Sequence, residues 1–227
     1  MNYALLLAYD GARFRGWQKQ PGLYTVQGAL EDAVKALLGR RLVIHGASRT
    51  DAGVHAEGQV ASLRTSSMDP SALVLPEGLK LLRSTAAPDS FHARATSCGK
   101  RYRYELGCFV RGGDWERARA ALRGLDGLAE LPGLSSPSKD RRPAPPLRSW
   151  SLSEEGVLLV EASAFRKHEV RNLAGHLGAV ALGYSAPESL RELAVSHRPW
   201  RGARAPADGL TLVEVLYPAG KDPFRAV

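Results

Sequence analysis

The sequence contains little cysteine and no long apolar run. Cys98 and Cys108 are the two cysteines among 227 residues, and their spacing fits neither a disulfide framework nor a set of metal ligands. No stretch of roughly eighteen consecutive apolar residues occurs, so we expect no membrane-spanning helix. Residues 1–10 become polar too soon for a signal peptide and are instead typical of a first strand. These absences argue against a disulfide-rich secreted protein and predict a cytoplasmic one.

Positive charge exceeds negative charge in this chain. Lys and Arg number 31 against 23 Asp and Glu, which gives a formal net charge of +8. Such a balance favours a polyanionic partner such as nucleic acid. Because a GC-rich genome also raises the arginine content, the clustering of the cations is the better evidence. The clusters lie at 13–19, 40–41, 100–103, 141–142 and 198–204, and several fall in Gly- or Pro-rich segments.

The spacing of apolar residues predicts both strands and helices. Val26 and Leu30 begin one apolar stripe after Thr25, a residue suited to cap a helix N-terminus. The order of elements, strands around a helix and then the same kind of sequence again, predicts an α+β fold. We expect two halves, 1–105 and 106–227, that share a sheet. The expected strands are Tyr3–Tyr9, Leu42–His45, Gln59–Arg64, Leu79–Thr85, Arg101–Phe109, Leu147–Leu152, Val157–Ala162 and Leu210–Tyr217, and the expected helices are Val26–Leu38, Trp115–Arg123, Val170–Leu182 and Glu188–Val195.

The most informative segment is Gly46–Gln59, with the sequence G-A-S-R-T-D-A-G-V-H-A-E-G-Q. Its glycines disfavour a regular helix, so we expect a loop that leaves a strand. Arg49 and Asp51 lie two positions apart on it, and loops on a rigid scaffold often carry functional residues. A nearby cation lowers the pKa of a carboxyl group, which suits an ionised nucleophile. On these residues alone, an R-x-D pair is more often a structural ion pair than a catalytic one.

The segment closely resembles the signature G-R-T-D-A-G-V-H-x-x-G-Q of the tRNA pseudouridine synthase A (TruA) family. Ser48 stands where the family usually has Gly, a change between two small residues. The resemblance implies that Asp51 is the catalytic residue and that Arg49 helps to hold the substrate.

A second block, Y-D-G-A-R-F-R-G-W-Q, follows the first expected strand. Phe14 and Trp17 could stack on RNA bases, or they could pack beneath a Gly-rich turn. The block is similar to Y-D-G-x-x-F-x-G-W-Q of the same family, followed by T-V-Q. We interpret it as partly structural and partly facing tRNA, without a catalytic role.

Two further blocks precede the middle of the chain. In K-R-Y-R-Y-E, period-two alternation places Tyr102 and Tyr104 on one face of a strand, where aromatic pairs usually pack in a core. The family carries R-Y-R-Y here, and the resemblance implies that Tyr102 stacks on the target base. The upstream F-H-A-R matches the family's D-F-H-A-R. We interpret His92 as structural rather than as a general base.

The remaining blocks lie in the second half. A-F-R-K-H-E-V-R-N is similar to the family's A-F-x-x-x-M-V-R-N, which implies that Arg171 pairs with the catalytic Asp. Glu169 replaces the usual Met. Near the C-terminus, G-L-T-L matches G-L-x-L, and the resemblance implies that Leu210 lines the substrate pocket. The resemblance is weakest from about 112 to 150, which includes the Pro-rich stretch 131–146, where we expect a loop.

The resemblance implies the pseudouridine synthase fold, in which two RRM-like halves share a mostly antiparallel sheet with a central cleft. It implies the isomerisation of uridine to pseudouridine in the anticodon arm, at tRNA positions 38, 39 and 40. The base must be flipped out of its stack to be reached. No cofactor and no metal are expected, since the reaction has no net redox change or group transfer. The family also implies a homodimer.

Two other classes of protein remain open from the sequence. A metal-dependent hydrolase could use Asp51 and His55, although Gly53 disfavours a helix that would align them and no further ligand cluster is evident. A non-catalytic RNA-binding protein would account for the charge and the aromatic residues, but it would leave the Arg49–Asp51 pair unexplained.

Overall fold

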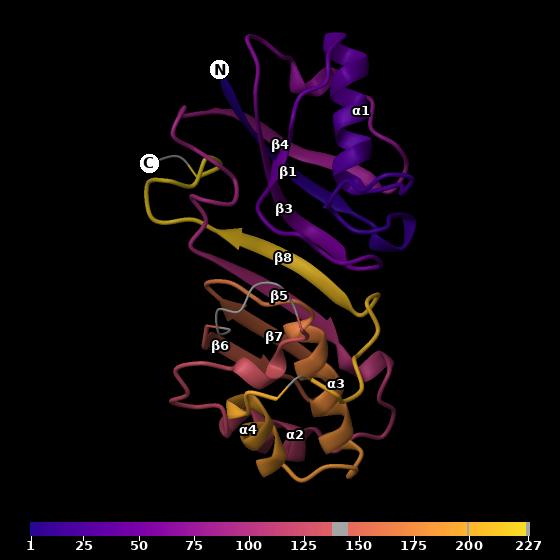
Figure 1. Cartoon of the computed structure of the whole chain (residues 1–227), viewed down its shortest axis with the longest axis vertical. Coiled ribbons are helices and arrows are strands. Elements are labelled where there is room, and N and C mark those ends of the chain that lie inside the picture. Colours follow the sequence, from indigo (N-terminus) through magenta and orange to yellow (C-terminus); the bar gives the residue numbers. More distant parts are fainter. Residues whose placement is uncertain (138–144, 199, 226–227) are drawn as a thin grey trace. The chain divides into compact units, whose positions relative to one another are not determined.

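The computed structural model describes residues 1–137, 145–198 and 200–225. Within these residues the chain forms eight strands and four α-helices, and no helix of this part is long and apolar enough to cross a membrane. The elements are β1 (Asn2–Tyr9), α1 (Val26–Leu38), β2 (His45–Gly46), β3 (His55–Arg64), β4 (Leu79–Ala87), β5 (Gly99–Glu105), α2 (Trp115–Arg123), β6 (Leu147–Leu152), β7 (Val157–Ala162), α3 (Glu169–Ala181), α4 (Glu188–Val195) and β8 (Leu210–Leu216) (Figure 1).

The predicted α+β class is confirmed, and α1, α2, α4, β6 and β7 have the predicted bounds. α1 begins as its sequence indicates, because the Thr25 hydroxyl accepts a hydrogen bond from the Gly28 N–H at 3.2 Å. Three predicted bounds differ clearly. β2 is His45–Gly46 rather than 42–45, β3 begins at His55, and β5 ends at Glu105 before a 3₁₀ turn over Leu106–Cys108.

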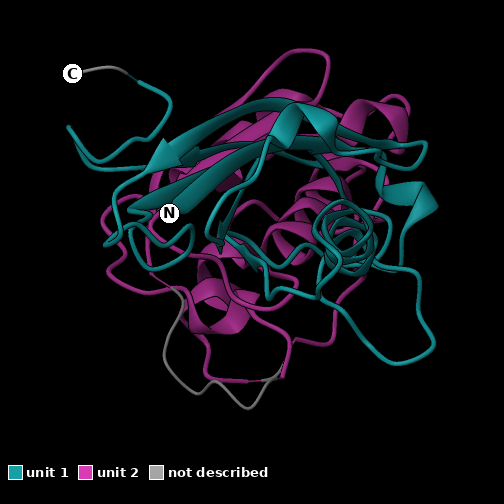
Figure 2. Cartoon of the chain, turned by 90° about the horizontal axis from the view of Figure 1, so that it is seen from above, with its two compact units in different colours: residues 1–100, 211–227 teal, residues 101–210 magenta. Residues whose placement is uncertain are grey.

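The chain divides into two compact units (Figure 2). The first comprises 1–100 and 211–227, and the second comprises 101–210. They differ from the expected halves, 1–105 and 106–227, because the last strand returns to the first unit. There β8 runs parallel to β3, with Thr211 opposite His55.

In the first unit the strands follow the order β4-β1-β3-β8, with β2 also on β3. β1 is antiparallel to β3 and to β4, and β2 is antiparallel to β3. Helix α1 covers one face of these strands in both views (Figures 1 and 2). Leu30 and Val34 of α1 and Leu5 and Leu7 of β1 are fully buried, so the apolar stripe of the helix closes the core of this unit.

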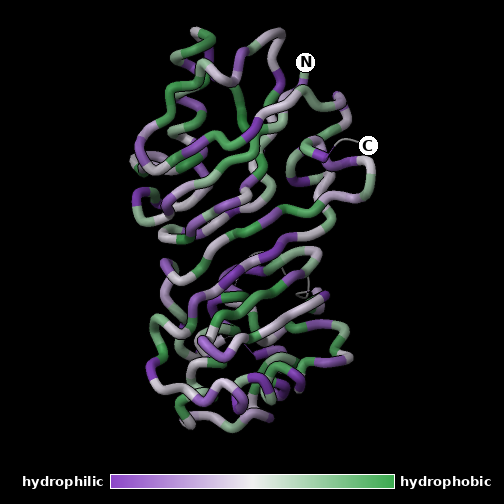
Figure 3. Tube along the Cα trace, turned by 180° about the vertical axis from the view of Figure 1, so that it is seen from behind, coloured by the Kyte–Doolittle hydropathy of each residue, from purple (hydrophilic) through white to green (hydrophobic). Residues whose placement is uncertain are grey.

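In the second unit the strands follow the order β5-β7-β6, and β6 is antiparallel to β7. Helix α2 lies against α3, α4 and β6. Leu158, Leu173, Leu177 and Leu190 are fully buried and form the core of this unit. Hydrophobic and hydrophilic stretches follow one another along the trace of both units, as expected for elements that bury one face (Figure 3).

Candidate active site

Residues 47–54 form the loop between β2 and β3 that carries Arg49 and Asp51. Arg49 is exposed and Asp51 is partly buried. The loop turns sharply after Asp51, since Gly53 has φ +86° and the Val54 N–H donates to the Asp51 carbonyl at 3.2 Å. The predicted loop is confirmed up to Val54. Beyond it the prediction of a loop was wrong for residues 55–58, which belong to β3, whereas Gln59 lies in the strand as predicted.

The side chain of Gln59 holds this loop from within the first unit. It is fully buried, and its Oε1 accepts from the Ser48 N–H at 3.1 Å while its Nε2 donates to the Ser48 carbonyl at 2.8 Å. The same Nε2 donates to the Tyr9 hydroxyl at 3.2 Å. Satisfying both backbone groups of a buried residue fixes the chain three positions before Asp51.

Tyr9 bonds in turn to Thr50, the residue before Asp51. Its hydroxyl lies 2.7 Å from the Thr50 Oγ1, and both groups are buried. Burial raises the pKa of Tyr9 to about 12, so the hydroxyl keeps its proton and can donate to Thr50 while it accepts from Gln59. Side chains therefore hold the Ser48 backbone and the Thr50 side chain, the two neighbours of Arg49.

The block that follows β1 packs against the same loop. The Trp17 N–H donates to the Thr50 carbonyl at 3.0 Å, and a Cβ at Gly46 would overlap the Trp17 indole. Gly16 has φ +90° and lies against the backbone of residues 50–52. Phe14 and Trp17 are only 3% and 2% exposed. Of the two uses considered for these rings, the structure shows packing beneath the loop.

The side chains of His55 and His92 both accept hydrogen bonds from backbone N–H groups of the first unit. The His55 Nδ1 accepts from the Gly11 N–H at 3.2 Å and lies 3.3 Å from a carboxylate oxygen of Asp10. The His92 Nδ1 accepts from the N–H groups of Arg94 and Ala95 at 3.1 and 3.2 Å, which closes a turn. These bonds support the structural interpretation of His92. In the described part of the chain, no three His, Cys, Asp or Glu side chains gather as a metal site would require.

The second unit holds Tyr102, Arg171 and Leu210. Tyr102 lies on β5, is 6% exposed, and packs edge-to-face on Phe165 with ring centroids 5.2 Å apart. Tyr104, two positions on, is also buried, as the alternation predicts, and its hydroxyl donates to the Pro206 carbonyl at 2.8 Å. Leu210 is 6% exposed at the first position of β8.

Arg171 lies in the first turn of α3 and is hydrogen-bonded to the segment 203–205. Its Nε donates to the Ala205 carbonyl at 2.9 Å, and its own carbonyl accepts from the Ala205 N–H at 3.0 Å. A Cβ at Gly175 would overlap the Ala203 carbonyl, so the segment 203–205 packs directly against the helix. Asn172 is fully buried and donates to the Leu134 carbonyl at 2.7 Å. These contacts fix the backbone from which Arg171 extends.

Glu169 begins α3 and is 2% exposed. Its Oε2 accepts from the Arg166 N–H at 2.6 Å, and its own N–H donates to the Arg166 carbonyl at 3.2 Å. His168 between them has φ +62°, the one positive φ among the described non-glycine residues. Burial raises the pKa of Glu169 to about 8, although Arg166 opposes the shift. The carboxyl group is therefore buried largely as the neutral acid.

Known proteins resemble this chain over nearly its whole length. Residues 135–218 match the family described as tRNA pseudouridine synthase. The tRNA pseudouridine synthase A of Bradyrhizobium diazoefficiens is 35% identical, with 95% of this chain and 99% of the relative covered. Those of Geotalea uraniireducens and Chloroflexus aurantiacus are 33% and 35% identical, with 94% and 96% of this chain and 98% and 89% of the relatives covered. The chain belongs to the tRNA pseudouridine synthase family.

The structure gives a role to two amide side chains that the motifs contain. Gln59 closes the Asp51 signature, and Asn172 closes the block with Arg171. Both are fully buried amides that bond to backbone groups. A glutamine or asparagine that ends a motif is the signal that could have identified them, because an amide side chain donates from its nitrogen and accepts at its oxygen at the same time.

In this tRNA pseudouridine synthase, the burial of Glu169 makes the free energy of unfolding depend on pH. The unfolded chain releases the proton near the ordinary pKa of 4.5, whereas the folded chain keeps it up to about 8. The unfolded state binds fewer protons than the folded state over this window, so this contribution to the free energy of unfolding falls as pH rises through it. One pKa unit corresponds to about 1.4 kcal/mol, so the fall amounts to a few kcal/mol.

Glu169→Gln, which cannot ionise, should lack this contribution. We expect the free energy of unfolding of this variant, relative to wild type, to rise between about pH 5 and about pH 9 in urea titrations. Glu154→Gln alters an exposed carboxylate and serves as the matched control with no such trend. An unchanged difference between wild type and Glu169→Gln at the two pH values would contradict a buried, protonated Glu169.

Proposed function

We propose that this chain isomerises uridine to pseudouridine in the anticodon arm of tRNA, at positions 38, 39 and 40. Membership of the tRNA pseudouridine synthase family makes it an isomerase of tRNA uridine. The observation that carries the site assignment is Asp51 on a loop whose neighbouring residues, Ser48 and Thr50, are held by Gln59, Tyr9 and Trp17. A carboxylate on a preorganised loop is suited to act on a single atom of a flipped nucleotide.

The reaction exchanges one bond to the sugar for another. The C1′–N1 bond breaks, the uracil turns and C1′ joins C5. The hydrogen of C5 leaves as a proton, and N1 takes up a proton in place of its bond to the sugar. Asp51 serves either as the nucleophile or as the base that removes a ribose proton. The atoms balance without an oxidant, a reductant or a second substrate. The proposed reaction therefore requires neither cofactor nor metal.

The other site residues receive proposed roles in holding the flipped base. Tyr102 would stack on the uracil, and its packing on Phe165 supports the ring in a fixed orientation. Arg171 is the proposed ion-pair partner of Asp51, and Arg49 would help to hold the substrate. Leu210 would line the base pocket. Stacking and ion pairing together would offset the few kcal/mol lost when the base leaves its stack.

Position mapping tests this proposal. A tRNA transcript incubated with the purified chain should contain pseudouridine at positions 38, 39 or 40 wherever these are uridine, and at no other uridine. EDTA should leave the rate unchanged when the RNA fold does not itself need a metal. Pseudouridine elsewhere would contradict the anticodon-arm assignment. Cleaved RNA with inhibition reversed by Zn²⁺ would favour the hydrolase, and binding without product would favour the RNA-binding protein.

We also propose a homodimer that acts in the cytoplasm and holds one tRNA across both subunits. The dispersed basic clusters suit such an extended surface, although Arg141 and Arg142 lie outside the described residues. If tRNA binding involves about six phosphate contacts, raising the salt concentration from about 50 to about 200 mM should weaken it roughly a thousandfold. The isolated anticodon stem-loop should bind much more weakly than whole tRNA. A monomer mass in light scattering with full activity, or equal affinity for both RNAs, would contradict this assembly.

A further inference from the structure

A pocket of about 440 Å³ lies in the first unit between the start of α1 and the segment 19–25 that precedes it. Its volume is within the range of about 300–1,000 Å³ typical of sites for small molecules. None of its lining residues belongs to the 47–54 loop. The lining combines two large exposed apolar side chains with two cations and one carboxylate, namely Leu23, Tyr24, Lys19, Arg41 and Asp32.

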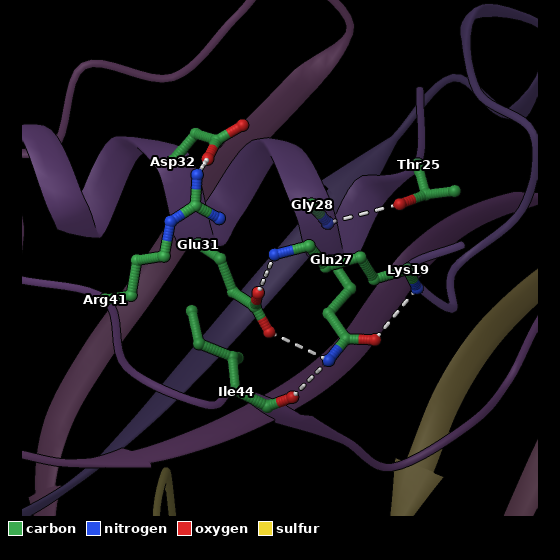
Figure 4. A network of polar contacts seen from close by, with 8 residues as sticks. All are labelled: Lys19, Thr25, Gln27, Gly28, Glu31, Asp32, Arg41 and Ile44. Carbon is green, nitrogen blue, oxygen red and sulfur yellow. Dashed lines mark hydrogen bonds and ion pairs between the residues drawn. The ribbon is translucent and has the colours of Figure 1, made fainter. Parts of the chain in front are cut away.

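A network of polar contacts joins the pocket residue Lys19 to helix α1 (Figure 4). Glu31 is 7% exposed and accepts from the Lys19 Nζ at 2.7 Å. Gln27 donates to Glu31 at 2.9 Å and to the Ile44 carbonyl at 3.1 Å, and it accepts from the Lys19 N–H at 3.0 Å. The segment with Lys19 is therefore joined to α1 before any ligand arrives, which lowers the entropy that binding would cost.

Tyr24 presents an aromatic surface at the pocket. Tyr24 is 54% exposed, and Leu23 beside it is 46% exposed. The Tyr24 ring stacks on the buried Phe14 ring, with centroids 5.2 Å apart and planes 20° from parallel. A ring that is supported in this way on one face offers its exposed surface to a planar ligand without losing much rotamer freedom.

The pocket is also lined by an exposed ion pair, Arg41 and Asp32, which a ligand could replace. Arg41 lies 3.5 Å from Asp32, and the two side chains are 57% and 66% exposed. Such an exposed ion pair contributes little free energy, so a ligand that supplies an anion and an amino group can replace it. A nucleotide has both, because its phosphate suits the guanidinium fork and the amino groups of adenine, cytosine and guanine suit a carboxylate.

We propose that this pocket binds an unpaired nucleotide of the tRNA other than the uridine that reacts. Its base would stack on Tyr24 with its amino edge toward Asp32, and its phosphate would contact Arg41. The inference rests on the proposed function for the identity of the RNA. It adds a second recognition site for RNA to the first unit, apart from the loop with Asp51.

Phe14 packs against residues of both the pocket and the support of the Asp51 loop, so it is not a suitable residue to substitute. Phe14 contacts Tyr24 on one side and the Tyr9 ring on the other, with centroids 6.4 Å apart, and Tyr9 reaches Thr50. Substitution of Phe14 would disturb both. Tyr24→Ala removes the exposed ring and leaves Phe14 and Tyr9 in place.

We expect Tyr24→Ala to raise the Kd for whole tRNA about five- to a hundredfold, the range found when one stacking ring is removed. The rate at saturating tRNA should stay the same, and Tyr24→Phe should bind like wild type. Tyr184→Ala removes an 81% exposed tyrosine of the second unit and should change nothing. Ultraviolet crosslinking should join tRNA to Tyr24, as mapped by peptide mass spectrometry.

Three outcomes would overturn the proposal. An unchanged Kd for Tyr24→Ala would exclude a base at this ring, and so would crosslinks confined to other segments. A change of mass in light scattering without a change in Kd would identify the pocket as a contact between protein copies. Repeating the binding measurements in an Asp51→Asn background keeps this test independent of turnover, so a failure of the proposed reaction would not be mistaken for a failure of the pocket.

Discussion

Asp51→Asn should abolish pseudouridine formation while the protein still binds tRNA. The variant keeps the shape of the side chain but removes the charge that either proposed role of Asp51 requires. We expect the rate at saturating tRNA to fall by on the order of a thousandfold or more, as for other residues that react directly with substrate. The Kd for tRNA should stay within about tenfold of wild type. Chromatography of nucleosides from digested tRNA measures the product.

The control for this prediction is another aspartate of the first unit. Asp89 is exposed and has no part in the proposed site, so Asp89→Asn should form pseudouridine at the rate of wild type. Appreciable product from Asp51→Asn would remove Asp51 from the mechanism. A loss of tRNA binding in step with activity would instead assign Asp51 to substrate binding.

Tyr102→Leu should be nearly inactive. Leucine occupies much of the same buried position against Phe165, but it offers no aromatic face to a base. Base stacking on an aromatic ring contributes about 1–3 kcal/mol in other proteins, so activity should fall about five- to a hundredfold from the loss of stacking alone. Tyr102→Phe keeps the ring and loses only the hydroxyl. Single-turnover rates of the two variants separate these contributions.

Stability must be measured beside activity for this pair, because Tyr102 is only 6% exposed. Loss of a buried ring also leaves a cavity and lowers the free energy of unfolding. Both variants should therefore be assayed well below their unfolding midpoints. Full activity of Tyr102→Phe would show that the ring alone matters. Full activity of Tyr102→Leu would contradict the assignment of Tyr102 to the base.

Local patterns in the sequence were enough to predict most of the elements. α1 has its predicted bounds because Thr25 caps its first turn and Leu30 and Val34 repeat at helical spacing on the buried side. Residues on β5 alternate, so Tyr102 and Tyr104 share the buried side of the strand. These features depend on neighbours within a few positions, which a sequence displays directly.

Long-range approach of the backbone was not predictable in the same way. Gly58 disfavours regular structure and predicts a loop, yet it lies within β3. A Cβ at this position would overlap the carbonyl of Val213 on β8. The glycine thus allows a strand from the far end of the sequence to pass closely. The pairing of β8 with β3, which makes the two units differ from the expected halves, also joins segments far apart in the sequence and was unpredictable for the same reason.

The candidate site was predicted by resemblance more than by physical reasoning. An R-x-D pair on a loop is too common to identify Asp51 by itself, and the family signature was needed. What neither source supplied is how the loop is held, because the bonds of Gln59 to Ser48 depend on side-chain positions in the fold. The burial of Glu169 was likewise visible only in the structure, although its place at a usual Met position had marked it as unusual.

Release of tritium from C5 of uridine tests the central claim most directly. A tRNA transcript labelled with tritium at C5 would be incubated with the purified chain, and both solvent tritium and pseudouridine would be counted. The account predicts one tritium released for each pseudouridine formed, with the release lost in Asp51→Asn. No release from labelled tRNA that the wild-type chain demonstrably binds would contradict it.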